Sequence, residues 1–264
     1  HVCLLGGPAT AKSSLLRWVC GFATPGVYVS GASSSAAGLT VCLAGDGGRD
    51  GGPLRAGALM RASGGVCAID DFDLLEERDR TAIHEAMVHQ TMSVAKAGTQ
   101  AQLSVDTSVL VGCSPVGEAS GAVQRAGFDL VVSLSDGHLP GHCFGEAIHD
   151  DELARHIIGM ACVGHDEPAI QAQNEASVEG LRRLVDCARK LEPALSAEAR
   201  ERIKSCYVDM RKRCVENVRG TDRGSSATPQ HLESLIRISE AVARARLERK
   251  VSAEHVNEAF ELMS

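Results

Sequence analysis

The chain has 264 residues, a formal net charge of −7 and 44% hydrophobic residues, enough to bury one large core or two smaller ones. Aromatic residues make up only 3%, so we expect a core of aliphatic side chains, which favours helices packed on a parallel sheet over an all-β sandwich. The acidic balance excludes a protein that coats nucleic acid over its whole surface, although it leaves room for local phosphate contacts.

The ten cysteines include no C-x-x-C pair, so neither a zinc ribbon nor a thioredoxin-type site is supported. We expect free thiols in a reducing compartment instead of a disulfide framework. No apolar run approaches the roughly 20 residues that a membrane span requires, which predicts a soluble cytosolic or nuclear protein with no membrane partner. Because the chain lacks an initiator Met and begins inside a predicted strand, we expect it to be a fragment without its upstream domain.

Five short apolar runs predict the strands of a parallel sheet that is covered on both faces. They span residues 2–5, 27–30, 66–69, 108–112 and 130–134. Helices are predicted over residues 13–21 and 78–90. Strands that alternate with helices indicate an α/β fold.

Two stretches are predicted to be irregular. Residues 43–53, LAGDGGRDGGP, are rich in Gly and Asp and indicate a loop or hairpin tip. Residues 136–150 carry His138, His142 and His149, whose spacing fits no helix face or metal motif, so a surface loop is favoured over a metal site.

Helical periodicity continues from residue 150 to the end of the chain. Thr228 followed by Pro229 predicts a helix start, and Ser196 and Ser252 are predicted to cap two more helices. We therefore expect an α/β domain over residues 1–172 and an all-helical domain over residues 173–264.

The stretch GGPATAKS, residues 6–13, nearly matches the phosphate-binding pattern G-x-x-x-x-G-K-[ST], with Ala11 in the place of the second glycine. A strand before it and a helix after it favour a phosphate-binding loop over a plain turn. Its amides would then hold phosphates, Lys12 would reach the outer phosphates and Ser13 would hold Mg²⁺. Alanine is tolerable in this place if Ala11 keeps a negative φ. The predicted nucleotide contacts are Gly6, Gly7, Pro8, Ala9, Thr10, Ala11, Lys12, Ser13 and Ser14.

The second motif is GGVCAIDDFD, in which a predicted strand ends in Asp70 and Asp71. ATPases with a phosphate-binding loop place one carboxylate on the magnesium ion and a second beside the attacking water. Because this strand follows the loop by about sixty residues, we assign Asp70 to the metal and Asp71 to catalysis.

Several stretches resemble the ATPase core of the minichromosome maintenance (MCM) family of hexameric DNA helicases. They are GGPATAKSSLL, GVYVSGASSSAAGLT, AGALMRASGGVCAIDDFD, DRTAIHEAMVHQTMSVAKAG and HLESLIRISEAVARARL. Within the family, the chain looks most similar to the eighth paralogue. Alanine before the lysine is also usual in the family.

The resemblance implies an AAA+ module with a helical lid, ATP and Mg²⁺ bound between the subunits of a ring, and two hairpins that face a central DNA channel. In the family, the lysine of V-A-K-A-G contacts DNA, which corresponds to Lys96; a solvated surface lysine is the plainer alternative. Arg49, in the place of the other hairpin, is a weaker DNA candidate. The resemblance implies a role in DNA replication and repair. The protein would work in the nucleus, or in the cytoplasm if it is prokaryotic.

Four positions depart from the family pattern. Asp71 replaces Glu, Ser114 replaces the sensor Asn, and Gly127 stands where the family has an arginine finger that acts on the neighbour's ATP. Arg125, two residues earlier, is the candidate substitute, and Gln230 replaces a second arginine in the lid. An absent finger typically lowers turnover by a factor of about 10³ to 10⁵.

Two functions remain open from the sequence. The leading one is an ATP-dependent, DNA-translocating helicase subunit, whose hydrolysis depends on an arginine from a partner. The alternative is an ATP-binding structural subunit with impaired hydrolysis in a mixed assembly. The D-R-T-A-I-H-E-A-M motif argues against another AAA+ branch, such as a metal chelatase or a clamp loader.

Overall fold

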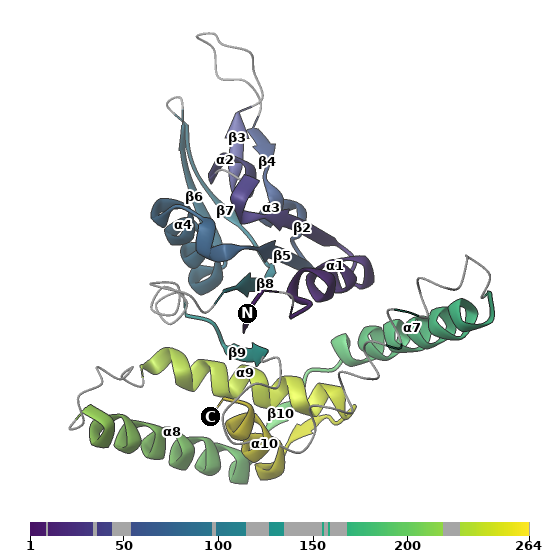
Figure 1. Cartoon of the computed structure of the whole chain (residues 1–264). Coiled ribbons are helices and arrows are strands. Elements are labelled where there is room, and N and C mark those ends of the chain that lie inside the picture. Colours follow the sequence, from purple (N-terminus) through teal and green to yellow (C-terminus); the bar gives the residue numbers. More distant parts are fainter. Residues whose placement is uncertain are drawn as a thin grey trace.

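A computed structural model gives the arrangement of the chain (Figure 1). It describes residues 1–8, 10–33, 36–43, 54–96, 99–114, 127–134, 155, 158, 168–218 and 228–263. Of the predicted loop at residues 43–53, Leu43 ends a strand and the rest lies outside the described residues. The predicted loop at residues 136–150, with His138, His142 and His149, also lies outside them.

The N-terminal part is built on a parallel five-stranded sheet, as predicted, with the order β2-β5-β8-β1-β9. The strands are β1 (Val2–Gly6), β2 (Gly26–Ser30), β5 (Val66–Asp70), β8 (Ser108–Cys113) and β9 (Leu130–Leu134). Each lies within a residue or two of its predicted bounds. In parallel sheets of this kind, ligands bind at the carboxyl ends of the strands, which here means the ends of β1, β5 and β8.

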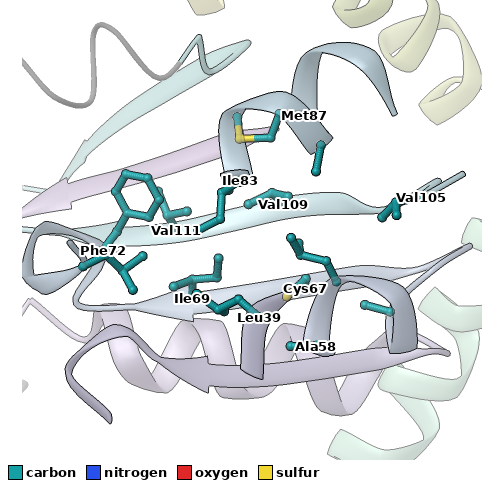
Figure 2. Packing of buried hydrophobic residues seen from close by; sticks show 14 of the residues in the cluster. Leu39, Ala58, Cys67, Ile69, Phe72, Ile83, Met87, Val105, Val109 and Val111 are labelled. Carbon is teal, nitrogen blue, oxygen red and sulfur yellow. The ribbon is translucent and has the colours of Figure 1, made fainter. Parts of the chain in front are cut away.

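Helices cover both faces of the sheet. On one face α1 (Lys12–Phe22) packs through Leu16 onto Leu4 and Ala68. On the other face the main cover is α4 (Glu77–His89), joined by the short helices α2 (Ala36–Leu39) and α3 (Ala58–Arg61). Figure 2 shows this second core, in which Ile83 and Met87 of α4 face the strand residues Val109 and Val111. Both predicted helices are therefore confirmed.

Two antiparallel hairpins extend from the sheet domain on the side away from the C-terminal helices (Figure 1). One pairs β3 (Val41–Leu43) with β4 (Leu54–Ala56), on either side of the predicted Gly-rich tip. The other pairs β6 (Thr91–Lys96) with β7 (Thr99–Ser104). Between β5 and α4 the chain makes a 3₁₀ turn at η2 (Phe72–Leu74), and η1 (Gly31–Ser33) follows β2.

The C-terminal part is helical, as predicted. It contains α7 (Pro168–Arg189), α8 (Ala197–Val218), α9 (Pro229–Ala245) and α10 (Ala253–Met263). A two-residue parallel pair, β10 (Ala194–Leu195) with β11 (Lys250–Val251), ties the loops together. Ala199, Leu235 and Val256 form the centre of its core and are fully buried. Helix α7 runs across the predicted domain boundary at residue 172, and that boundary stays a prediction.

The starts of three helices carry the predicted polar residues. The Oγ atom of Ser196 accepts a hydrogen bond of 3.1 Å from the Ala199 N–H at the start of α8. At Ser252 the direction is reversed, because the Ser252 N–H donates to Nδ1 of His255 at 3.2 Å. Thr228 before α9 makes the same bond, with its N–H donating to Nδ1 of His231 at 3.2 Å.

Six cysteines in the described part of the chain are free thiols: Cys3, Cys20, Cys67, Cys113, Cys187 and Cys206. Cys3 and Cys113 lie on neighbouring strands with their Sγ atoms 3.8 Å apart, and both are fully buried. Burial raises the pKa of Cys67 to about 12. Such thiols behave as small apolar core residues.

Candidate nucleotide-binding site

The predicted phosphate-binding loop connects the end of β1 at Gly6 to the start of α1 at Lys12. A Cβ atom at Gly6 would lie 2.7 Å from both the Leu134 carbonyl oxygen and Thr10 Oγ1, so only glycine fits there. The unpaired N–H groups of the first turn of α1 point toward the loop, as the amides at any helix start do, and they attract anions.

Ala11 adopts a left-handed backbone conformation, with φ 59° and ψ 16°. The negative φ under which alanine is tolerable without strain is therefore not what the loop adopts. A glycine in this place would be free of the steric penalty of Cβ, whereas alanine pays about 1 kcal/mol or more for it. The loop keeps the geometry that the second glycine of the pattern usually provides.

Lys12 curls back over the loop. Its Nζ atom donates hydrogen bonds to the carbonyl oxygens of Gly6, at 2.7 Å, and of Gly7. Thr10 Oγ1 lies 3.3 Å from the same nitrogen and donates to the Gly7 carbonyl oxygen at 2.9 Å. The ammonium group is thus held at the centre of the loop, beside the helix start.

Asp70 ends β5 with its carboxylate almost fully buried, since the residue is 4% exposed. Its Oδ2 atom accepts a hydrogen bond of 2.7 Å from the Tyr28 hydroxyl, and Oδ1 accepts one of 3.1 Å from the Asp71 N–H. A buried carboxylate requires such donors, because an unpaired one would be strongly destabilising.

Gly112, near the end of β8, separates Asp70 from the start of α1. A Cβ atom there would lie 3.0 Å from Asp70 Oδ1, 3.1 Å from Leu16 Cδ1 and 3.7 Å from Lys12 Cβ. The tertiary structure therefore brings the two sequence motifs to the same point, on either side of a residue without a side chain.

Asp71 also has a left-handed backbone, with φ 49° and ψ 49°, a conformation that Asp tolerates better than most residues. Burial, followed by the charges of Asp70 and Asp73, raises the pKa of Asp71, while the charge of Lys12 opposes the rise. A residue other than glycine with a left-handed backbone, next to a buried carboxylate, is typical of turns at functional sites.

The phosphate-binding loop, the buried acid and the helical C-terminal part match one family of known proteins. Residues 1–124 match the MCM P-loop domain, and residues 179–264 match the MCM AAA-lid domain. The chain is an AAA+ domain of the MCM family with its lid. Because a P-loop domain of this kind binds a nucleotide, the site described above is a nucleotide site by family.

The MCM domain is also similar to curated proteins along its whole length. It is 37% identical over 276 residues to DNA replication licensing factor mcm6 of Schizosaccharomyces pombe, and 37% identical over 275 residues to MCM6 of Arabidopsis thaliana. DNA replication licensing factor MCM5 of Oryza sativa subsp. indica is 36% identical over 282 residues. Each alignment covers 100% of this chain and 29%, 32% and 37% of the respective relative, so the chain spans about a third of their length.

In this MCM domain the sensor position lies at the same edge of the sheet as the nucleotide loop. Ser114 follows β8 directly, and its N–H donates to Asp73 Oδ1 at 3.4 Å. The roles predicted for Ser114 and Asp71 stay predictions.

The lid residue Gln230 contacts Gly127, the residue in the predicted arginine-finger place. Its Nε2 atom donates a hydrogen bond of 3.1 Å to the Gly127 carbonyl oxygen. Gly127 has φ +68°, and a Cβ atom there would lie 2.2 Å from Gln230 Nε2. The two departures from the family pattern thus form one contact between the sheet domain and the lid.

Next to this contact, Asp129 ties the lid to β9. One of its oxygens accepts hydrogen bonds of 2.6 Å from both Ser234 Oγ and Arg237. The backbone nitrogen of His1 lies 2.6 Å from the other oxygen. Sequence reasoning missed Asp129, Tyr28 and Gly112, because nothing in their local pattern shows which distant residue they meet.

The remaining predicted site residues are placed as follows. Pro8, Ser13 and Ser14 are exposed at the loop and the first turn of α1. Lys96 is the last residue of β6, opposite Thr99 at the end of the hairpin. Ala9, Arg49 and Arg125 lie outside the described residues, so their roles stay predictions.

Proposed function

We propose that the chain is the ATP-binding part of a DNA-translocating helicase subunit that works in a ring with other MCM-type subunits. The observation that carries the proposal is the meeting of Lys12, the start of α1 and the buried carboxylate of Asp70 around Gly112. A cation, a row of helix amides and an acid at one sheet edge are what a nucleoside triphosphate and its metal require.

The residues present fit a bound Mg·ATP. The loop amides and Lys12 would hold the phosphates, and Lys12 would exchange the carbonyl oxygens of Gly6 and Gly7 for phosphate oxygens. Ser13 and Asp70 would hold the magnesium ion, which would supply positive charge to the phosphate oxygens. Asp71 would orient and deprotonate the attacking water, and Ser114 would hydrogen-bond the water or a phosphate oxygen.

The alternative, an ATP-binding subunit with impaired hydrolysis, is supported by the contact between Gly127 and Gln230. An amide and a glycine stand where the family has two arginines, and neither supplies a positive charge to a neighbour's phosphates. We therefore infer that a ring of this chain alone hydrolyses ATP poorly, and that a mixed ring turns over ATP where a partner provides the arginine.

For DNA, we propose that the hairpin of β6 and β7 carries Lys96 to the strand, with Arg49 of the other hairpin as a weaker contact. Both hairpins extend from the same side of the sheet domain in Figure 1. Lysine suits a contact that follows the phosphate backbone without reading sequence.

The same proposal includes a nuclear location, a hexameric ring and a role in replication or repair. It also includes the domain boundary at residue 172. The named relatives are DNA replication licensing factors of eukaryotes, which supports a nuclear role in replication. Those relatives are sixth and fifth members of the family, so the likeness to the eighth paralogue remains a proposal carried by the N-terminal and lid motifs. Among the described helices, none has the length and apolar character that crossing a bilayer demands.

The test is ATP binding followed by single-turnover ATP hydrolysis, with the chain alone and mixed with another MCM-type subunit. We expect binding in both cases and fast hydrolysis only in the mixture. If Lys12→Ala leaves ATP affinity unchanged, the nucleotide site is wrong. Equal, rapid hydrolysis by the chain alone would instead contradict the dependence on a partner arginine.

DNA binding is tested separately. Lys96→Ala should weaken DNA binding and reduce the slope of log affinity against log salt concentration, because fewer counterions are released. An unchanged affinity and slope would remove Lys96 from the DNA site.

A further inference from the structure

We propose that Tyr28 is a positioning residue for Asp70, whose carboxylate it orients toward the start of α1 for magnesium binding. The proposal rests on the proposed nucleotide site and adds to it a residue of β2, which neither sequence motif contains. Tyr28 acts through Asp70, so its effect is expected on the metal and not on the nucleotide alone.

The register of the sheet brings the tyrosine to the acid. Tyr28 pairs with Ala68 and Ser30 pairs with Asp70 in the parallel ladder between β2 and β5. Side chains two residues apart on a strand share a face, so Tyr28 and Asp70 lie on the same face of the sheet, the one that α1 covers. Ala68, directly opposite Tyr28 on this face, has a small side chain, so the phenol ring has room to reach Asp70.

The two oxygens of Asp70 have different surroundings. Oδ2 accepts the hydrogen bond from Tyr28, at 2.7 Å. Oδ1 faces Gly112, 3.0 Å from where a Cβ atom would stand, and that point is 3.7 Å from Lys12 Cβ. Oδ1 also accepts the 3.1 Å hydrogen bond from the Asp71 N–H. The tyrosine thus holds one oxygen of the carboxylate, while the other lies beside Gly112, on whose far side α1 begins with Lys12 and the other proposed magnesium ligand, Ser13.

The phenol itself is fixed from the other side. The guanidinium carbon of Arg17, on α1, lies 5.1 Å from the centre of the Tyr28 ring, within the range of a cation–π contact. A phenol is protonated at physiological pH, so the Tyr28 hydroxyl donates to the Asp70 carboxylate. Arg17, Tyr28 and Asp70 therefore form a chain of contacts from α1 across β2 to β5.

Residues that orient a metal ligand typically change metal affinity by 10- to 100-fold when mutated. Tyr28→Phe removes the hydroxyl and keeps the ring. We expect the Mg²⁺ concentration that half-saturates the tight Mg·ATP complex to rise about tenfold. ATP affinity measured in excess EDTA should stay within about twofold, because the loop and Lys12 are untouched. The melting temperature of the free protein should fall by a few degrees, because the buried Asp70 carboxylate loses one hydrogen-bond donor.

The matched control is Tyr207→Phe. Tyr207 is the other tyrosine of the chain, and it also lies under an arginine, with the Arg211 guanidinium carbon 5.8 Å from its ring centre, but it belongs to α8 of the lid. This variant should leave the Mg²⁺ dependence unchanged. In an Asp70→Asn background Tyr28→Phe should have no further effect on the Mg²⁺ dependence, because the group it orients is gone.

The outcomes separate the two proposals. If wild-type protein binds ATP neither with Mg²⁺ nor in EDTA, the proposed nucleotide site fails. If wild type binds Mg·ATP and Tyr28→Phe shows the wild-type Mg²⁺ dependence, only the role of Tyr28 is overturned. A loss of ATP affinity in EDTA equal to that in Mg²⁺ would also overturn it, since that result marks a merely structural residue.

Discussion

The carbonyl oxygen of Gly127 accepts a hydrogen bond of 3.1 Å from the side-chain amide of Gln230, which joins the sheet domain to the first turn of the lid helix α9. The family pattern has an arginine at each of these places. Their replacements contact each other within one chain, whereas the resemblance assigns the arginines to a neighbour's nucleotide. The contact therefore stabilises the position of the lid on its own domain.

Gly127→Ala tests this contact. The new Cβ meets both a positive φ of 68° and the Gln230 amide at 2.2 Å. We expect the free energy of unfolding, measured in urea, to fall by about 1–2 kcal/mol because of the backbone strain. The broken hydrogen bond should lower it by about 1 kcal/mol more. Gly64→Ala is the matched control, because Gly64 has φ +80° and nothing within 4 Å of its Cβ position. Equal losses for the two variants would show that the Gln230 contact contributes nothing.

Ala11→Gly should stabilise the protein. Ala11 adopts φ 59°, so removing its Cβ relieves a steric penalty that exceeds the added entropy of the unfolded chain. We expect the free energy of unfolding, measured in urea, to rise by up to about 1 kcal/mol. Ala241→Gly, on the exposed side of α9, should show the opposite sign and lose about 1 kcal/mol. A loss at Ala11 as well would contradict the left-handed conformation.

Asp71→Glu should speed ATP hydrolysis. The longer side chain moves the carboxylate by about one methylene, and a misplacement on the order of 1 Å can change a rate about a hundredfold. We expect the single-turnover rate in a mixed ring to rise at least several-fold, with a loss of stability of less than about 1 kcal/mol because glutamate tolerates a φ of 49° less well than aspartate. Glu77→Asp, an exposed change of the same size in α4, serves as the control. A rate that falls or stays constant would show that Asp71 does not orient the water.

Asp129→Asn should loosen the lid in a pH-dependent way. Burial by itself raises the pKa of Asp129, but the hydrogen bonds and charges around the carboxylate, among them those of Ser234 and Arg237, outweigh burial and lower the pKa. A lowered carboxyl pKa stabilises the fold above the unfolded value of about 3.9, and this contribution disappears as the pH falls through the folded value.

The measurement is the free energy of unfolding of wild type and Asp129→Asn between pH 7 and pH 3. We expect a difference of about 2 kcal/mol at pH 7 that shrinks as the pH falls below about 4. The surface pair of Asp209 with Lys212, 3.8 Å apart, provides the control, since Asp209→Asn should change stability by less than about 1 kcal/mol at any pH. A difference that is constant with pH would show that the charge of Asp129 is not what binds the lid.

Much of the fold follows from local patterns. The five strands and the helices α1 and α4 were predicted within a few residues, because apolar periodicity and the positions of Gly and Pro act over short distances. The loop before Lys12 and the acids at the end of β5 were recognised for the same reason. Local patterns failed at Ala11, whose positive φ is imposed by the loop between β1 and α1 against the preference of alanine.

By itself, the sequence determined the succession of the sheet strands and main helices along the chain, the phosphate-binding loop, the paired acids and the helical lid. Each of these depends on residues that are close together in the sequence. Only the tertiary structure decided that Tyr28 reaches Asp70, that Gly112 separates Asp70 from Lys12, and that Gln230 meets Gly127. These contacts depend on strand register and on the packing of the lid. Both are set by the burial of the whole core, which no short stretch of sequence contains.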